Sequence, residues 1–367
     1  MSAGANSPGR SAGSDLDLVG EAVGEVLRDR CTPEVVDGAE ETGWAAGLWD
    51  AVAAGGFPWV SVPERAGGPA VGGSVAEACA VLEQVGRFAA PLPVAETGLL
   101  GGWLLDAAGL AVPDGPVTTA AGPVTLRRAA NGWVADGRVA RVPWARVAAR
   151  VVLLAEGPDG VAVVAVDPAR AGIEPGVNLA GEPRDTVHLD GVAVDEIAAA
   201  PDGPDALRRR GALSRVALIA GACGRILELT VAYTNDRHQF GRPVARFQAV
   251  AAHLVRLAEQ TEAVRVAARV CAANAGAGDD RTPSAFDVAA AKSVASEAAG
   301  TVAALAHQAT GAMGMTREYE LGRLTRRLWS WREEYGGERE WSTRLGASLA
   351  ADGADALWPT IARGAVA

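Results

Sequence analysis

Three stretches of the chain differ in the spacing of their apolar residues. From about residue 15 to 110, apolar side chains recur at intervals of three and four, which is the repeat of an α-helix with one buried face. Between residues 111 and 201 the runs are short, β-branched and separated by turn residues, as at Val161–Val166. From 202 to 367 the helical spacing returns. The pattern predicts a helical N-terminal domain, a β domain and a C-terminal helical domain.

The middle stretch carries clear strand and turn signals. Val151–Leu154 and Val161–Val166 flank the turn sequence G-P-D-G, and Thr186–Leu189 precedes Asp190-Gly191, which we expect to form a two-residue hairpin turn. Short strands at this spacing are typical of a small antiparallel β-barrel or sandwich. The predicted fold class is therefore α+β and mostly α.

The two helical stretches differ in how completely they are expected to be buried. In the first, Ser74 and Glu77 form a capping-box sequence at the start of a helix. The last stretch consists of long, alanine-rich and nearly uncharged segments. Helices of this composition are buried on several faces, so we expect a four-helix-bundle-like domain that packs against another copy or a partner chain.

Composition excludes several classes of protein. The 367 residues are 49% hydrophobic with a mean hydropathy of +0.12, enough to build large cores. A net charge of -10 argues against a nucleic-acid partner. No stretch has about 18 apolar residues without a charge, so we expect no membrane span. Residues 1–14 have no apolar signal core and are expected to form a disordered tail.

The cysteines and histidines do not form a recognisable metal or disulfide pattern. They are widely spaced, which favours a reducing cytoplasm and argues against a structural zinc site. No G-x-G-x-x-G sequence follows a strand and opens a helix, so a Rossmann site has no support. The residues are Cys31, Cys79, Cys223, Cys271, His188, His238, His253 and His307.

The stretch Arg237–Gln248, R-H-Q-F-G-R-P-V-A-R-F-Q, stands between two long apolar segments. Its Gly241 and Pro243 interrupt the helical repeat. Arginine offers a planar set of donors to phosphate, and glutamine can pair with polar ring edges, so the stretch could hold a flat, anionic ligand. It could equally be an ordinary helix connection with solvated charges.

The domain order and two motifs together resemble the acyl-CoA dehydrogenase family. The motifs are Tyr233–Gln248 and H-Q-A-T-G-A-M-G-M-T-R-E-Y at His307–Tyr319, with V-P-E-R-A-G-G at Val62–Gly68 in support. The resemblance covers nearly all of the chain from Leu18 to Leu349.

This resemblance implies an enzyme that uses FAD to remove hydrogen from the α and β carbons of an acyl-CoA thioester. A carboxylate takes the α proton, the flavin takes hydride, and electrons pass to an electron-transferring flavoprotein. The adenosine-diphosphate end of FAD reaches a neighbouring subunit in this family. The residues that match this part of the cofactor site are Arg237, Gln239, Phe240, Phe247, Gln248, Gln308 and Gly311.

Other parts of the family's site are altered. The segments expected around the flavin ring read T-A-A-G-P at Thr119–Pro123 and R-V-P-W-A-R at Arg141–Arg146. The family's base position carries Tyr335, and the alternative base position carries Ser214. Neither side chain ionises near neutral pH without help.

Glu334 is the candidate base, because a shift of one residue would bring it into the site. Buried against acyl chain and flavin, its pKa would be raised and suited to proton abstraction. In the alternative interpretation, Glu333 and Glu334 are both solvated charges.

These departures are similar to a subset of actinobacterial dehydrogenases linked to steroid breakdown and built as heterotetramers of two unlike subunits. In those enzymes, one subunit carries the base and the other completes the FAD site. We therefore expect an acyl-CoA dehydrogenase that works as one subunit of a homo- or hetero-oligomer. A catalytically silent subunit that completes the FAD site of a partner is the alternative. An oxidase or hydroxylase on the same scaffold would instead react directly with oxygen.

Overall fold

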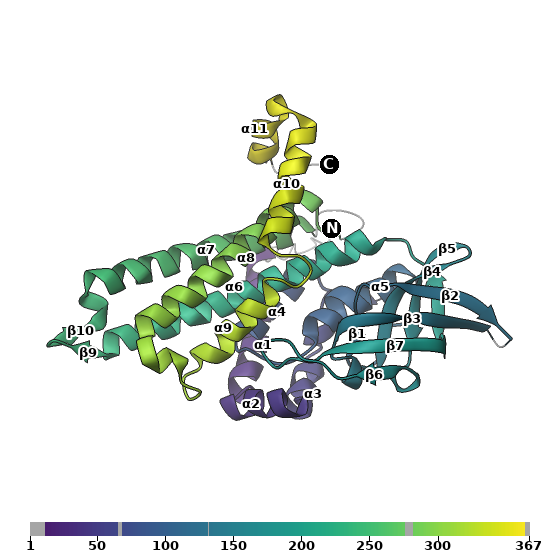
Figure 1. Cartoon of the computed structure of the whole chain (residues 1–367), viewed down its shortest axis with the longest axis horizontal. Helices are drawn as coiled ribbons and strands as arrows, with labels where there is room; N and C mark the ends of the chain where they lie inside the picture. The colour runs from purple at the N-terminus through teal and green to yellow at the C-terminus, as the bar shows by residue number, and fades with distance from the viewer. Residues whose placement is uncertain (1–11, 65–67, 131, 276–281, 364–367) are drawn as a thin grey trace, which may run out of the picture.

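The computed structural model describes residues 12–64, 68–130, 132–275 and 282–363. A group of short helices and a β-sheet lie beside one end of a long helical bundle, and the final two helices project from the bundle (Figure 1). Helix α1 begins at Ala12, so the last three residues of the predicted tail are helical. Residues 1–11 lie outside the described residues.

The N-terminal part is helical, as its apolar spacing predicts. The Ser74 hydroxyl accepts a hydrogen bond from the Glu77 amide and the Glu77 carboxylate accepts one from the Ser74 amide, so the predicted capping box forms. The last helical stretch begins with a π-helical segment, Ala95–Gly102, which is buried throughout. The helices are α1 (Ala12–Arg30), α2 (Pro33–Thr42), α3 (Ala46–Ala54), α4 (Val75–Arg87) and α5 (Trp103–Ala107).

The middle part is a single eight-stranded sheet of order β6-β7-β3-β2-β4-β5-β8, with β1 beside β4. Most pairs are antiparallel, whereas β1 and β2 each pair with β4 in parallel. Its apolar core is formed by alternate residues of the longer strands. The strands are β1 (Val117–Thr119), β2 (Val124–Ala129), β3 (Gly132–Pro143), β4 (Arg150–Gly157), β5 (Gly160–Val166), β6 (Gly172–Glu174), β7 (Arg184–Ala193) and β8 (Glu196–Ala199).

One of the two predicted turns in this sheet is wrong. The G-P-D-G sequence does join β4 to β5 as an antiparallel hairpin. Asp190 and Gly191, in contrast, lie inside β7, which continues to Ala193. Gly191 has φ +61°, and the register between β3 and β7 shifts at this level, so the sequence marks an irregularity in the strand rather than its end.

The C-terminal part is a bundle of long helices. By length and composition α6 could cross a membrane, but more than half of its most apolar window is buried inside the fold. It packs against α4, α7, α8 and α9, so we interpret it as a core helix. The helices are α6 (Pro204–Asp236), α7 (Gln248–Ala275), α8 (Ala285–Thr310), α9 (Leu321–Trp331), α10 (Glu338–Asp352) and α11 (Ala354–Arg363).

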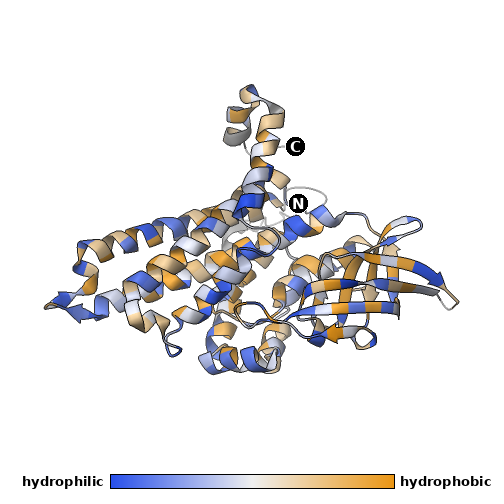
Figure 2. Cartoon of the chain, viewed as in Figure 1, coloured by the Kyte–Doolittle hydropathy of each residue, from blue (hydrophilic) through white to orange (hydrophobic). Residues whose placement is uncertain are grey.

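Two glycines allow α4 and α6 to pack unusually close together. A Cβ at Gly221 would overlap the carbonyl of Glu83, and a Cβ at Gly86 would overlap the carbonyl of Leu218. The close crossing joins the N-terminal helices to the bundle through one continuous apolar core. Figure 2 shows the contrast between the apolar residues along the bundle and strands and the hydrophilic tip at the far end of α6. The four cysteines are unpaired thiols.

Candidate functional site

The predicted turn at Arg237–Gln248 is a short β-hairpin at the tip of the bundle. Strands β9 (His238–Gln239) and β10 (Arg242–Pro243) pair antiparallel. The two residues between them, Phe240 and Gly241, have φ +50° and +77°. Two consecutive residues with positive φ form the tight turn that matches strand twist, which explains why a glycine stands here.

The side chains of this hairpin point to solvent. Phe240 is 92% exposed, and its ring meets that of Phe247 edge-on at a centroid distance of 6.1 Å. Arg242 stacks its guanidinium 4.3 Å from the centre of the Phe247 ring. Within the described residues, the side chains of Arg237 and Gln239 have no hydrogen-bond or ion-pair partner. The tip therefore presents an aromatic platform beside unused polar groups.

The end of α8 is also exposed and carries two more predicted residues. Gln308 faces solvent, and Gly311 ends the helix with φ +60°. No atom lies within 4 Å of the position that a Cβ would take at Gly311, so the backbone there is open to an approaching ligand. All seven predicted cofactor residues thus lie on the exposed or half-buried surface of the bundle, away from the sheet.

This location bears on whether one chain can hold a whole FAD. The hairpin follows the C-terminal end of α6, and the sheet lies beside its N-terminal end (Figure 1). With 33 residues α6 is about 50 Å long, which exceeds the reach of a dinucleotide. The exposed polar and aromatic groups at the tip are chemically suited to the adenosine-diphosphate end of FAD, and they lie at the opposite end of α6 from the sheet.

Glu334 lies where the sheet meets the bundle, in the turn after α9. Its carboxylate accepts hydrogen bonds from Arg184 of β7 at 2.8 Å and 3.1 Å and from Arg215 of α6 at 2.6 Å. Asn178 is a further donor, at 3.4 Å. The side chain is buried, so the interpretation of Glu334 as a solvated charge is wrong. Glu333, in contrast, is exposed.

Glu334, Arg184 and Arg215 form what we call the Glu334 clamp. This clamp belongs to a larger network of buried charges. Arg215 also binds Glu96 at 2.6 Å, and Glu96 lies in the π-helical segment of the N-terminal part. On the other side Arg184 binds Glu182 at 3.1 Å. Arginines and glutamates alternate, so every charge here has an opposite neighbour.

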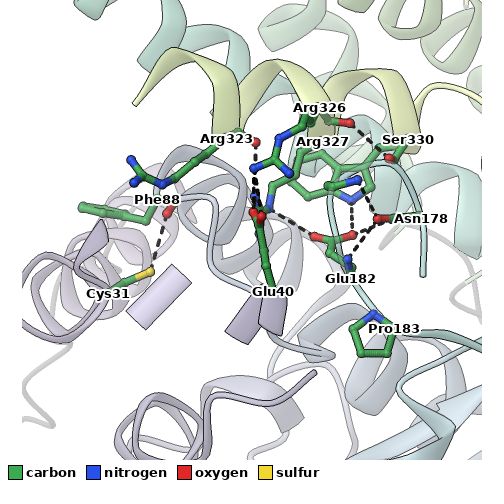
Figure 3. Close-up of polar contacts among 12 residues, drawn as sticks. Cys31, Glu40, Phe88, Asn178, Glu182, Pro183, Arg323, Arg326, Arg327 and Ser330 are labelled. Atoms are coloured by element: carbon green, nitrogen blue, oxygen red, sulfur yellow. Dashed lines mark hydrogen bonds and ion pairs between the residues drawn. The ribbon is translucent and has the colours of Figure 1, made fainter. Parts of the chain in front are cut away.

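The network continues from Glu182 toward the first helices (Figure 3). Arg327 of α9 is fully buried and lies 3.2 Å from Glu182 and 3.7 Å from Glu40 of α2. Asn178 and Trp331 donate to the same Glu182 carboxylate. One chain of ion pairs therefore connects the N-terminal helices, the sheet and the bundle. We call it the junction network: Glu40, Glu96, Glu182, Arg184, Arg215, Arg327 and Glu334.

The electrostatics of Glu334 contradict the raised pKa expected from the sequence. Burial by itself would raise the pKa of Glu334, but the charges of Arg184 and Arg215 outweigh this and lower the pKa to about 2. A carboxylate with so low a pKa has little tendency to take a proton. The sequence identified a buried carboxylate but missed the two arginines.

Tyr335 and Ser214 do not supply an alternative base in this geometry. Burial raises the pKa of Tyr335 above its ordinary value, although Arg215 opposes the shift. The Ser214 hydroxyl is buried, donates to the carbonyl of Gly211 at 2.6 Å and accepts from Arg215 at 3.2 Å. Among the described residues, neither group has a partner that would remove its proton.

A cavity of about 240 Å³ lies between the sheet and this turn. The sheet and its loops contribute three alanines, a proline and two arginines, and the bundle and the turn after α9 contribute the other charged groups and a tyrosine. Beside it, the space among Trp144, Trp331 and the apolar residues of α4 is only about 10 Å³. Side chains thus fill the space on this side of the junction network, whereas the larger cavity on the other side is open. The larger cavity is lined by Ala120, Ala121, Ala140, Arg141, Pro143, Arg184, Arg215, Glu333, Glu334 and Tyr335.

Family models match both helical parts of the chain. The acyl-CoA dehydrogenase N-terminal domain matches residues 14–110, and the acyl-CoA dehydrogenase C-terminal domain matches residues 207–347. Together the two matches cover more than half of the chain. The chain belongs to the acyl-CoA dehydrogenase family. This confirms the sequence-based identification and, at the level of the family, an oxidoreductase that acts on acyl-CoA with FAD.

Relatives with unlike subunits stand among the similar proteins. The chain is 29% identical over 338 residues to acyl-CoA dehydrogenase IpdE2 of Mycolicibacterium smegmatis, covering 91% of this chain and 99% of that protein. It is similar to a chain of the ChsE4-ChsE5 complex from Mycobacterium tuberculosis, with a TM-score of 0.82, 26% identity and coverage of 94% and 98%. A steroid acyl-CoA dehydrogenase, Tcur3481-Tcur3483, gives a TM-score of 0.79 at 26% identity, with coverage of 94% and 100%.

The part of the chain that the structure describes contains no set of side chains suited to bind a metal ion. No group of three or more histidine, cysteine, aspartate or glutamate side chains there could hold a metal ion. The residues that sequence reasoning missed are Glu96, Glu182, Arg184, Arg215 and Arg327. For Glu96 and Arg215 the signal was a charged residue inside an otherwise apolar run, which is expensive to bury without a partner.

Proposed function

We propose that this chain is the base-poor subunit of an FAD-dependent acyl-CoA dehydrogenase made of two unlike chains. It would hold the adenosine-diphosphate end of the cofactor at its bundle tip, while the partner chain supplies the catalytic carboxylate. The observation that carries the proposal is the Glu334 clamp: the carboxylate nearest to the family's base position is held by Arg184 and Arg215.

The roles of the residues at the tip follow from their chemistry. Arg237 would pair with the diphosphate, because a guanidinium is a permanent charge with a planar set of donors. Gln239 and Gln308 can donate to or accept from polar edges of the adenosine. Phe240 and Phe247 provide an apolar surface on which a flat ring can lie. Bound FAD would supply the hydride acceptor, and the electrons would pass to an electron-transferring flavoprotein.

The junction network supports this division of labour. In a catalytic subunit, a base must be free to receive a proton. Here Arg184 and Arg215 lower the pKa of the nearest carboxylate to about 2. Membership of the family, together with likeness to two-component relatives, favours a partner chain of the same fold. Four unpaired cysteines favour a reducing compartment such as the cytoplasm.

The test is to purify the chain alone and together with a co-expressed acyl-CoA dehydrogenase chain encoded beside it. We expect the isolated chain to show no bleaching of flavin absorbance with acyl-CoA, and the complex to show both bound FAD and turnover. Bleaching and turnover by the isolated chain would reject the proposal.

Two variants of the complex distinguish the role of the bundle tip from the role of the turn after α9. Arg237→Ala should lower FAD affinity about tenfold to a hundredfold, because it removes a charge-assisted hydrogen bond to the cofactor. Tyr335→Phe should leave turnover unchanged, since the partner supplies the base. Loss of turnover in Tyr335→Phe with FAD still bound would show that this subunit takes part in proton transfer.

A further inference from the structure

The chain contains a single lysine, Lys292, among 34 lysine and arginine residues. Lys292 lies in α8 and is fully buried. All the other basic positions are arginine, so a lysine here calls for a chemical reason. A compact ammonium group offers three donors that can point to three acceptors, whereas a guanidinium is planar and larger.

The ammonium of Lys292 has three oxygen partners. It donates to the carbonyl of Trp331 at 3.2 Å, to the carbonyl of Arg332 at 2.8 Å and to the hydroxyl of Ser296 at 3.0 Å. The Ser296 hydroxyl in turn donates to the carbonyl of Arg332 at 3.0 Å. These carbonyls end α9, where the helix leaves its last acceptors unpaired and its dipole is negative.

The turn that follows these carbonyls has a strained backbone. Tyr335 has φ +57° and Gly336 has φ +103°. A tyrosine in the left-handed region is strained and persists only where the surroundings fix it. On the far side, the indole of Trp341 donates to the Tyr335 carbonyl at 3.0 Å. Lys292 holds the other side of the turn through the carbonyls of Trp331 and Arg332.

We propose that Lys292 is the positioning residue for the turn formed by residues 333–336. By holding the end of α9, it sets the place from which Glu334 reaches Arg184 and Arg215 and from which Tyr335 borders the 240 Å³ cavity. It does not touch the cavity itself. The role concerns the geometry of this turn and holds whether or not the bundle tip binds FAD.

The charges around Lys292 determine how firmly it holds the turn at different pH. Burial lowers the pKa of Lys292 to about 7. Glu334 and Glu333 oppose this shift, whereas Arg215 and Arg332 reinforce it. Because the pKa is lowered in the folded protein, an opening that hydrates Lys292 takes up a proton above pH 7. Such an opening of the turn should therefore become less favourable as pH rises from about 7 toward the ordinary lysine pKa.

Hydrogen-deuterium exchange of the isolated chain, read by mass spectrometry, tests this role without flavin or partner. In Lys292→Gln we expect peptides spanning residues 331–337 to exchange at least about tenfold faster than in the wild type, because buried carbonyls lose their donor. Peptides spanning 237–248 serve as the internal control and should exchange at the wild-type rate.

The pH profile distinguishes positioning by the ammonium from simple packing. After correction for intrinsic exchange, protection of residues 331–337 in the wild type should rise between pH 7 and pH 9, and in Lys292→Gln it should be flat. Equal protection in both proteins, or a wild-type profile without this rise, would overturn the proposal. If Lys292→Gln does not fold, Ser296→Ala decides: a smaller loss of protection confined to the turn supports the role, and unchanged protection rejects it.

Discussion

The bundle tip and the junction network are both built around arginine, yet they use it in opposite ways. At the tip Arg237 is exposed and has no side-chain partner among the described residues, next to a phenylalanine that is 92% exposed. At the junction Arg184, Arg215 and Arg327 are buried, and each is paired with glutamate. The tip leaves its charge without a partner among the described residues, whereas each arginine of the junction lies beside an opposite charge.

This difference indicates where a ligand can bind. Groups that are already paired and desolvated gain little from a new partner, while exposed and unpaired groups can be recruited at small cost. The junction network joins three parts of the fold. The tip is a surface whose exposed groups can still bind a partner. The predictions below test this contrast from the largest expected effect to the smallest.

Removal of the Glu334 charge should have the largest effect on stability. Glu334→Gln keeps the shape of the side chain but leaves Arg184 and Arg215 short of a counter-charge inside the protein. Breaking a buried ion pair in this way costs about 3–5 kcal/mol in the free energy of unfolding. Urea unfolding followed by circular dichroism would measure the loss.

The matched control is an exposed ion pair. Arg87 and Glu228 form a bidentate pair at 2.7 Å that is partly exposed to water. Glu228→Gln should cost less than about 1 kcal/mol, because solvent screens the interaction. Equal losses of unfolding free energy in Glu334→Gln and Glu228→Gln would contradict a stabilising role for the buried ion pairs of the junction network.

Acid should weaken the ion pairs of Glu334 in a defined pH window. The folded-state pKa of Glu334 is lowered to about 2, below the value of about 4.3 in an unfolded chain. A group with a depressed pKa contributes its full stability above pH 4.3 and loses it as pH falls toward 2. The contribution is about 3 kcal/mol. The difference in unfolding free energy between the wild type and Glu334→Gln should shrink over this range, and a constant difference from pH 5 to pH 2 would refute the assignment.

The sequence predicted the order of the three parts, the capping box at Ser74, one hairpin and the family. These features depend on local spacing or on motifs that lie close together in the chain. The hairpin at the tip was predicted only as a turn, because its two strands are too short to show a period. The Asp190-Gly191 turn was wrong because pairing with β3 carries β7 through it.

The junction network could not be predicted, for a different reason. Arg184 and Glu334 are 150 residues apart, and nothing in the sequence near either residue indicates the other. The direction of a pKa shift depends on such distant partners. From the sequence alone, burial of Glu334 implied a raised pKa, and the two arginines reversed its sign. The cofactor residues at the tip remain predictions, because no ligand contact tests them.

A glycine on α6 tests how tightly the turn at the junction is packed. A Cβ at Gly211 would overlap the ring of Tyr335, so Gly211→Ala should destabilise the chain by about 1–3 kcal/mol. Gly224 lies on the same helix with no atom within 4 Å of a Cβ. Gly224→Ala should instead stabilise by up to about 1 kcal/mol through helix propensity. Thermal unfolding of the two variants compares them directly. Equal shifts of Tm would show that the turn rearranges to accommodate the added methyl group.

The smallest effect on stability is expected at the tip, from Phe240→Asn. Phe240 makes few contacts and has φ +50°, a conformation that asparagine tolerates better, and the change creates the Asn-Gly sequence favoured in tight hairpins. The unfolding free energy should stay within about 0.5 kcal/mol of the wild type or rise slightly. The FAD content of the co-purified complex should nevertheless fall, because the aromatic platform is lost. A stable variant with full FAD content would show that Phe240 does not contact the cofactor, and a loss of more than about 1 kcal/mol in the isolated chain would show that the tip is part of the folded core.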